Sequence, residues 1–218
     1  MEDIYQSIAD LGKQYKADKI VLYGSRARGD NRERSDIDIA VFGMPKENQS
    51  EFLQAVGNLP TLLDFDIVFI TDRTSETLMN NIKKDGVVIM DKFSEKLSKF
   101  SDAIKSLEDA LNEYEEYKIT SSRDGVIQRF EFCTELAWKS TREYLIAQGY
   151  VEINSPKSVM KQAYADGIID DEQAWLDLLY ARNLTSHIYD ETTASDIFDD
   201  IKDKFLTLFH QLQDKLMQ

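Results

Sequence analysis

The hydrophobic pattern of this 218-residue chain changes type near residue 92. Before that point, short apolar runs alternate with stretches of helical periodicity, which indicates strands and helices in one small domain. The runs lie near residues 19–23, 37–42, 62–70 and 87–90. Beyond it, apolar residues recur only at spacings of three and four, which is typical of packed helices. We therefore predict an α+β domain with a small mixed sheet at residues 1–92, followed by an all-α up-and-down helical bundle at residues 95–218.

Helix signals refine this division. In the first domain, helical periodicity covers residues 4–15, 51–56 and 75–84, and a short helix is expected from Ser25. The bundle pattern predicts about five helices, the second of which spans about residues 123–148. Capping signals for the later helices are Ser155 before Pro156, Asp170 three residues before Gln173, and Thr193 or Ser195.

Composition narrows the class of protein. The net charge of −14 argues against sequence-blind binding to nucleic acid, which needs a basic surface. Residues 1–92 hold 12 Lys and Arg against 16 Asp and Glu, whereas the remainder holds 14 against 24. No apolar run approaches the length of about 20 residues that spans a bilayer, and residues 1–15 are acidic and amphipathic, unlike a signal peptide. Cys133 is the single cysteine, which excludes an internal disulfide and a cysteine zinc cluster. We expect a cytoplasmic protein that does not bind membranes.

Two carboxylates mark the stretch at residues 20–41. Side chains alternate along a strand, so Asp36 and Asp38 point to one face while Ile37, Ile39 and Val41 point into a core. Two carboxylates about 4 Å apart repel by roughly 4 kcal/mol at an effective dielectric constant near 20. A divalent cation that prefers oxygen ligands, Mg²⁺ or Mn²⁺, would turn this repulsion into ligation.

The turn before this strand is suited to phosphate. Gly24 lets the backbone approach a ligand closely, and Ser25 begins a predicted helical turn. Arg26 and Arg28 add positive charge beside it. Enzymes that transfer nucleotidyl or phosphoryl groups combine a phosphate-binding turn with a carboxylate-bound metal ion in this way.

A Gly-Ser turn followed about ten residues later by Asp-x-Asp resembles the signature of the DNA polymerase beta-like nucleotidyltransferase superfamily, and the wording around it resembles the minimal nucleotidyltransferase branch. The matching residues are Gly24, Ser25, Asp36 and Asp38. The resemblance implies a Mg²⁺-dependent enzyme that uses a nucleoside triphosphate, expected to be ATP.

The resemblance also implies a third carboxylate from a neighbouring strand. Asp66 is the candidate because it directly precedes the apolar run 67–70, and strand alternation can aim it at the first two carboxylates. An unpartnered acid in such a run would be costly to bury. Asp64 has the same parity and stays an alternative.

A second polar cluster lies at residues 182–189. It resembles the Arg-x4-6-His motif of the HEPN superfamily, here in the form Arg182-x4-His187-x-Tyr189. In HEPN members that are ribonucleases, the arginine and histidine of the motif pair across a homodimer and cleave RNA without a metal ion. The resemblance therefore implies this catalytic role for Arg182 and His187. In toxin–antitoxin members it implies that the transferase adds AMP to the motif tyrosine, which makes Tyr189 a candidate acceptor. Without the resemblance, the cluster would be a capped helix end with a solvent-facing histidine.

Several functions follow as hypotheses. The first is an adenylyltransferase that modifies a protein hydroxyl, or another acceptor, presented by the helical domain. The second is a HEPN-type ribonuclease regulated by the fused transferase domain. A small-molecule transferase resembling the aminoglycoside-modifying enzymes, or a binding bundle with a degenerate transferase domain, are further alternatives. We expect a homodimer through the bundle, with a protein or RNA partner.

Overall fold

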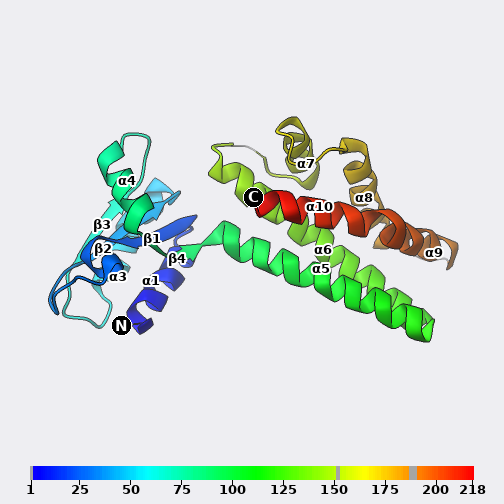
Figure 1. The fold of residues 1–218 in the computed structure, drawn as a ribbon, viewed down its shortest axis with the longest axis horizontal. Helices are drawn as coiled ribbons and strands as arrows, with labels where there is room; N and C mark the ends of the chain where they lie inside the picture. The colour runs from blue at the N-terminus through cyan, green and yellow to red at the C-terminus, as the bar shows by residue number, and fades with distance from the viewer. Residues whose placement is uncertain (1, 151–152, 187–190) are drawn as a thin grey trace. The chain divides into compact units, whose positions relative to one another are not determined.

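The computed structural model describes residues 2–150, 153–186 and 191–218. The chain divides into two compact units, Met1–Lys92 and Phe93–Gln218 (Figure 1). The predicted fold classes are confirmed: a small mixed sheet with helices comes first, and a helical region follows. Within the described residues, no helix is both long and apolar enough to cross a membrane.

The first unit contains a four-stranded sheet in the order β3-β2-β1-β4 among its described residues. β1 runs antiparallel to β2 and β4, whereas β2 and β3 are parallel. Its elements are α1 (Glu2–Gln14), β1 (Lys19–Tyr23), α2 (Gly24–Arg28), β2 (Ile37–Phe42), α3 (Lys46–Gly57), β3 (Phe65–Phe69), α4 (Glu76–Asp85) and β4 (Val87–Asp91).

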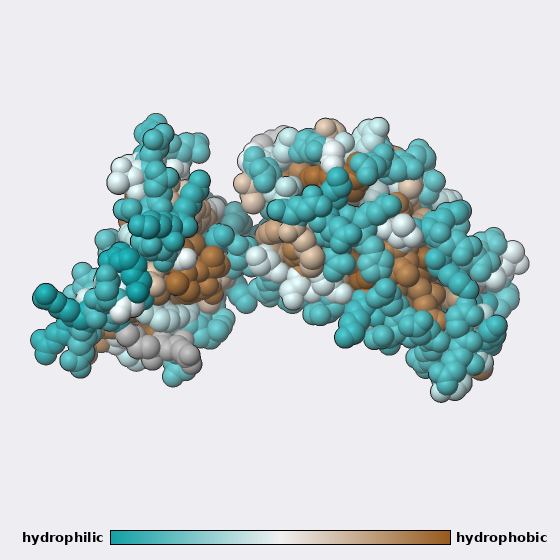
Figure 2. All heavy atoms as spheres, in the orientation of Figure 1, coloured by the Kyte–Doolittle hydropathy of each residue, from teal (hydrophilic) through white to brown (hydrophobic). Residues whose placement is uncertain are grey.

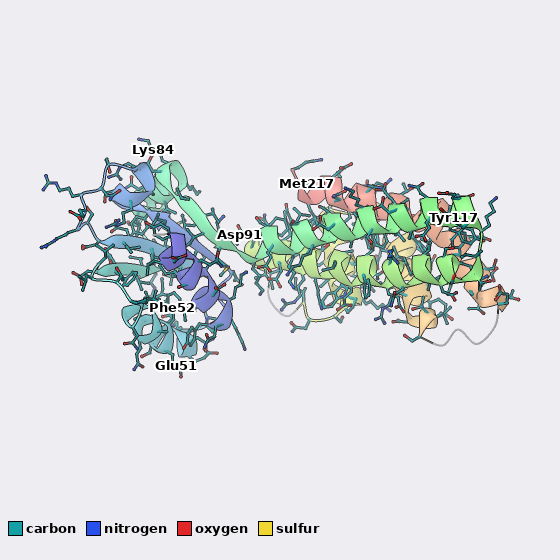
Figure 3. The ribbon with its side chains drawn as sticks, turned by 90° about the horizontal axis from the view of Figure 1, so that it is seen from below. Glu51, Phe52, Lys84, Asp91, Tyr117 and Met217 are labelled. Carbon is teal, nitrogen blue, oxygen red and sulfur yellow. The ribbon has the colours of Figure 1, made fainter. Side chains whose placement is uncertain are left out.

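The two faces of the sheet are covered differently. Ile20, Ile37 and Ile39 belong to the larger core, together with Ile8 of α1 and Phe52 of α3, and all five are fully buried. Figure 3 labels Phe52 beside Glu51, which is exposed on the same helix. The opposite face has a smaller cluster formed by Val21, Ala40 and Ile82 of α4. This thinner cover leaves room for polar side chains at the ends of the strands.

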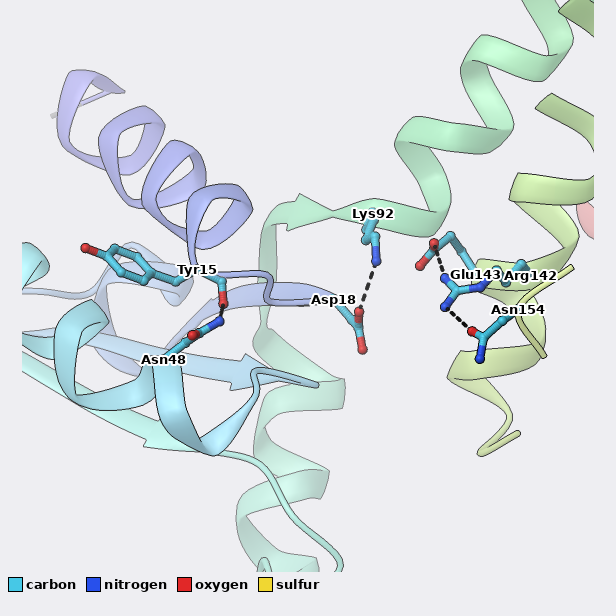
Figure 4. Close-up of polar contacts among 7 residues, drawn as sticks. All are labelled: Tyr15, Asp18, Asn48, Lys92, Arg142, Glu143 and Asn154. Carbon is cyan, nitrogen blue, oxygen red and sulfur yellow. Dashed lines mark hydrogen bonds and ion pairs between the residues drawn. The ribbon is translucent and has the colours of Figure 1, made fainter. Parts of the chain in front are cut away.

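Polar contacts fix the connections around this sheet. The side-chain amide of Asn48 donates to the carbonyl oxygen of Tyr15 at 3.0 Å, which ties α3 to the end of α1 (Figure 4). Lys92 and Asp18 form an ion pair at 3.6 Å in the same view. Asp18 also lies against Gly43, where a Cβ atom would meet its carboxylate. Glycine at this turn is therefore a packing requirement.

The second unit is a helical bundle. Its elements are α5 (Lys92–Tyr117), α6 (Thr120–Ala147), α7 (Pro156–Ala165), α8 (Glu172–Thr185), α9 (Glu191–Asp200), the π-helical turn η1 (Ile201–Phe205) and α10 (Leu206–Leu216). Aromatic rings fill its centre: Phe130 of α6 stacks on Phe205 at 5.4 Å between centroids, and Trp175 meets Phe209 edge-on at 6.0 Å. On the face drawn in Figure 2, hydrophilic residues cover most of the helices and hydrophobic ones show between them.

The last helix contains an irregular turn. The backbone N–H of Leu206 donates to the carbonyl oxygen of Ile201, five residues back, so residues 201–205 form a π turn between α9 and α10. The helix continues through it, as the sequence pattern predicts. Ile201 and Phe205, the first and last residues of the turn, are both buried.

Several boundaries differ from the predictions. The second-domain N-cap that precedes Trp175 is Asp171, whose carboxylate accepts from the N–H of Ala174, and the prediction of Asp170 is wrong. β3 begins only at Phe65, because Leu62 is fully exposed and belongs to the preceding loop. Cys133 is buried, and burial raises the pKa of its thiol to about 12.

Candidate active site

Tyr23, Asp38 and Asp66 form a row across three strands, on the sheet face that carries α4. Tyr23 of β1 pairs with Asp38 of β2, and Asp38 pairs with Asp66 of β3. Directly paired residues point to the same face of a sheet, so a phenol and two carboxylates lie side by side. The row stands at the end of β1, immediately before Gly24.

The electrostatics of the row reflect this crowding. Partial burial raises the pKa of the Asp38 carboxyl, the negative charges of Asp66 and Asp36 raise it further, and Arg28 and Arg26 oppose the rise. Burial, followed by the charges of Asp66 and Asp38, raises the pKa of Tyr23 to about 12. The phenol is therefore a neutral hydrogen-bond donor beside two carboxylates at physiological pH.

The structure separates the two candidates for the third carboxylate. Asp66 is in register with Asp38, and its negative charge raises the pKa of Asp38. Asp64 precedes β3, and the same register places it opposite Asp36. Asp36 lies one residue before β2 and is exposed. The three carboxylates predicted from sequence, Asp36, Asp38 and Asp66, are thus electrostatic neighbours, with Asp38 the most enclosed.

Gly24 lies directly against this group. Its φ angle is +71°, and a Cβ atom at this position would be 2.1 Å from Oδ2 of Asp38. Only glycine permits both the backbone conformation and the close approach. Ser25 follows in the first turn of α2, and its carbonyl oxygen accepts from the N–H groups of Gly29 and Asp30. The Gly-Ser turn is therefore packed against the carboxylate strand.

Arg26 is buried and bonded to its own loop. Nε donates to the carbonyl oxygens of Ser35 at 2.9 Å and Asp36 at 3.1 Å, and Nη2 donates to those of Ser35 at 2.6 Å and Glu33 at 3.3 Å. Four hydrogen bonds from one guanidinium fix the path of the chain into β2. Arg26 therefore positions the strand that carries Asp38, and its predicted role in nucleotide binding stays a prediction.

Arg28 is more accessible. It forms an ion pair with Asp30 at 3.1 Å, and its side chain is 43% exposed. A pair this exposed contributes little stability, on the order of 0 to 1 kcal/mol. Arg28 can therefore exchange Asp30 for another anion at small cost, which suits the phosphate contact predicted from sequence.

Asp38 and Asp66 provide carboxylate oxygens suited to a divalent cation. Among residues 2–150, 153–186 and 191–218, no three carboxylate, imidazole or thiol side chains converge as a metal site on their own. Mg²⁺ commonly binds through only one or two carboxylates and completes its shell with water and nucleotide phosphates. Asp38 and Asp66 form an all-oxygen pair whose mutual repulsion a cation would relieve, so the donor set fits.

Arg182 of the second predicted site lies on α8 and lines a cavity beside α6. Glu135 of α6 faces the same cavity, and its pKa is lowered, against the effect of its partial burial, by Lys139, Trp138 and Arg182. His187 and Tyr189 lie outside the described residues.

The chain on both sides of residues 187–190 is tied to α6. The Thr185 hydroxyl donates to Glu131, and the two Nη atoms of Arg123 donate to the Glu191 carboxylate at 2.6 and 3.1 Å. Hydrogen bonding to Arg123 lowers the pKa of Glu191. The Arg123 side chain is only 10% exposed, so this bidentate pair is partly shielded from solvent.

Sequence reasoning missed Tyr23 and Glu135. Tyr23 ends the first strand, but its place in the row depends on the pairing of β1 with β2, which strand alternation alone does not give. Glu135 lies 47 residues before Arg182 in the sequence, and only the packing of α6 against α8 brings the two to one cavity.

Comparison with known families places both units. Residues 6–95 match the model described as "Polymerase beta, Nucleotidyltransferase", and residues 95–218 match the model described as "Nucleotidyltransferase substrate binding protein like".

Individual relatives resemble parts of this chain. A probable ribonuclease HepT of Haemophilus influenzae is 33% identical over 83 residues, which are 36% of this chain and 57% of that protein, so the match spans little more than half of the relative. The structure of HI0074 from Haemophilus influenzae, described as a substrate-binding domain of a nucleotidyltransferase, is 27% identical with a TM-score of 0.50. That match covers 56% of this chain and 99% of HI0074.

A tri-AMPylated HEPN toxin of Shewanella oneidensis, in complex with an MNT antitoxin, is 16% identical with a TM-score of 0.49. The match covers 57% of this chain and 96% of that one. This likeness is too distant to carry a functional argument.

The contact between Gly24 and Asp38 can be isolated with a matched pair of variants. Gly24→Ala and Gly29→Ala both place a Cβ atom at a positive φ, but nothing lies within 4 Å of the Gly29 position. We expect each substitution to lower the free energy of unfolding by about 1 to 2 kcal/mol, because alanine is strained at a positive φ. Only in Gly24→Ala does the new Cβ atom also push the Asp38 carboxylate toward solvent. The pKa of Asp38, measured by carboxyl-carbon NMR, should therefore fall toward its ordinary value in that variant alone. Equal Asp38 pKa values in the two variants would contradict this contact.

The raised pKa of Asp38 also makes the stability of the fold depend on pH. Its folded-state pKa is raised, so the folded state loses stability as the pH rises above the unfolded pKa of about 3.9. In the presence of a chelator, Asp38→Asn should therefore raise the urea midpoint at pH 7, and the gain should vanish near pH 3, below both pKa values. A variant less stable than the wild type at pH 7 would show that Asp38 is favourably paired there.

Proposed function

This chain belongs to the family of nucleotidyltransferase substrate-binding-like proteins and carries a polymerase beta-type nucleotidyltransferase domain before that part, and from this premise we propose that it transfers AMP from ATP to a hydroxyl acceptor. The observation that carries the proposal is the pairing of Asp38 with Asp66 beside Gly24. Family membership supports a nucleotidyltransferase, and the choice of adenylyl group rests on the sequence resemblance.

The residues around Asp38 divide between metal binding and phosphate binding in this proposal. Asp38 and Asp66 would hold Mg²⁺, or Mn²⁺, with Asp36 as a further ligand. The bound ion supplies positive charge for the triphosphate and for the leaving pyrophosphate. Gly24 and Ser25 bring backbone close to the phosphates, and Arg28 neutralises a phosphate oxygen. The alternative task of Asp66, which is exposed, is to accept the proton of the attacking hydroxyl. The hydroxyl oxygen then bonds to the α-phosphorus, and pyrophosphate departs.

The acceptor is proposed from the second motif. Tyr189 lies in the Arg182-x4-His187-x-Tyr189 sequence, whose resemblance to HEPN toxins implies AMP addition to the tyrosine. The ties of Thr185 and Glu191 to α6 hold the flanks of that segment. We place the modification either within one chain or between the subunits of a homodimer formed through the bundle.

Transfer is tested with purified protein, Mg²⁺ and each labelled nucleoside triphosphate in turn. We expect label from ATP on the protein, lost with chelator. Asp38→Asn and Asp66→Asn should reduce it on the order of a hundredfold or more, because each removes a group that acts on the reacting atoms. Asp64→Asn is the matched control on the same segment and should keep activity. Label that survives the Asp36→Asn/Asp38→Asn double substitution would refute the transferase.

The acceptor has its own control. Tyr189→Phe should abolish incorporation, whereas Tyr180→Phe, an exposed tyrosine on α8, should not. If Tyr189→Phe is labelled as well as the wild type, Tyr189 is not the acceptor, and peptide mass analysis of the labelled chain then locates the modified residue.

A second function is favoured by the likeness to a protein named as a probable ribonuclease. In that case Arg182 would stabilise charge on a phosphate and His187 would transfer the proton at a ribose hydroxyl, with no metal needed. We expect His187→Ala to abolish cleavage of RNA in the presence of chelator. Equal cleavage by the variant and the wild type would exclude this function.

A further inference from the structure

A cavity of about 460 Å³ opens between α6, α7 and α8 of the bundle. Its volume lies in the range of sites that hold one small organic molecule. We call it the α6–α8 cavity. Its lining includes Glu135 and Trp138 of α6, Lys157 of α7, and Leu176, Leu179 and Arg182 of α8.

Part of the lining of the α6–α8 cavity is apolar and aromatic. Trp138, Leu176 and Leu179 are partly buried there, and Tyr180 is 65% exposed at the rim. The indole N–H of Trp138 donates to Glu135 at 2.9 Å, which fixes the orientation of the ring. Flat surfaces of this kind bind flat apolar groups, because aromatic faces bury much area at low cost in side-chain entropy.

The charges of the α6–α8 cavity favour an anion. Its lining has two cations, Lys157 and Arg182, and one carboxylate, Glu135. That carboxylate already binds Lys139 at 2.7 Å and Trp138, so its charge is compensated. No ion pair within 4 Å joins Lys157 or Arg182 to a carboxylate of the described chain. Lys157 lies in the first turn of α7, whose positive dipole end adds to the same preference.

A second hollow of the bundle provides the contrast. It covers about 640 Å³ beside α8, α9 and α10, and four aspartates line it: Asp171, Asp177, Asp196 and Asp200. Its one lining cation, Lys204, is paired with Asp200 at 2.6 Å. The α6–α8 cavity therefore has more cations than carboxylates in its lining, whereas the second hollow has more carboxylates than cations. This difference in charge predicts that the two hollows prefer ligands of opposite charge.

We propose that the α6–α8 cavity binds a small organic anion with a flat apolar body. The anionic group, a phosphate monoester or a carboxylate, contacts Lys157 and Arg182, and the flat body lies against Trp138 and the two leucines. Charge-assisted hydrogen bonds from Arg182 fix the orientation of the anion. This binding needs neither nucleotide nor metal and stands apart from the transfer reaction proposed above.

The two tryptophans of the chain give a direct readout. Trp138 lines the α6–α8 cavity, whereas Trp175 is 2% exposed in the bundle core, so their indole N–H signals in ¹H–¹⁵N NMR serve as reporter and internal control. The full chain is titrated with four compounds of one shape: phenyl phosphate, phenylacetate, benzyl alcohol and benzylamine. We expect saturable shifts of Trp138 with one or both anions, little effect from the alcohol and the amine, and a stationary Trp175. The stronger anion then identifies the phosphate or carboxylate class.

Variants test the contacts. Arg182→Gln and Lys157→Gln should each weaken binding of the preferred anion on the order of tenfold, since each removes a charge-assisted contact. Lys161→Gln is the matched control, because Lys161 lies on the same helix but pairs with Glu172 at 3.7 Å outside the cavity lining. The Trp175 signal and the chemical-shift dispersion report whether each variant is folded.

Three results would overturn the proposal. Trp138 could respond equally to benzylamine and to the anions, or both Gln variants could bind as the wild type does. Alternatively, no probe could shift Trp138 while the chain elutes as a dimer, which would mean that a second copy covers the cavity. Because no nucleotide is present, failure here leaves the transferase assays unaffected, and failure of those assays leaves this binding intact.

Discussion

The parallel pairing of β2 with β3 is the constraint on which the site of the first unit depends. It sets Asp38 and Asp66 level with each other, so two like charges share one face at a strand spacing of about 5 Å. The chain tolerates their repulsion because neighbouring groups fix the surroundings. Gly24 closes against Asp38 without a side chain, and Arg26 holds the entry to β2 through four backbone carbonyl contacts. A cation bound by Asp38 and Asp66, as proposed above, would relieve this repulsion without movement of the strands.

Much of this arrangement could be predicted from local pattern. Strand alternation gives the shared face of Asp36 and Asp38, and the change of periodicity near residue 92 gives the two fold classes. The choice between Asp64 and Asp66 could not be made in this way, because both have the same parity and only the register of β2 with β3 distinguishes them. The same limit applies to Arg26. Its charge suggests a phosphate contact, but its burial against backbone carbonyls is a tertiary fact.

In the bundle, helix periodicity predicts the elements but not the surfaces between them. Ser155 with Pro156 is recognisable as a helix start, because the cap and the proline are adjacent in sequence. The N-cap of α8 is harder to identify from sequence, because Asp170 and Asp171 are neighbours and either carboxylate could accept from a free N–H of the first turn. The backbone geometry makes Asp171 the cap. That Glu135, Lys157 and Arg182 line one cavity is harder still to predict from sequence, because each comes from a different helix. Pairwise spacing along a sequence carries no information about such a meeting.

The π turn at residues 201–205 has a consequence for how this helix compares with others. Four of its buried residues, Ile197, Ile201, Phe205 and Phe209, are spaced four apart, and an ideal α-helix would rotate each by about 40° relative to the one before. The wider turn removes most of that drift and returns Phe209 to the face on which Ile197 lies. In effect the helix contains one surplus residue, absorbed without a break. An alignment with a relative that lacks the turn needs a one-residue gap inside a continuous helix, at the position where gap penalties usually forbid one.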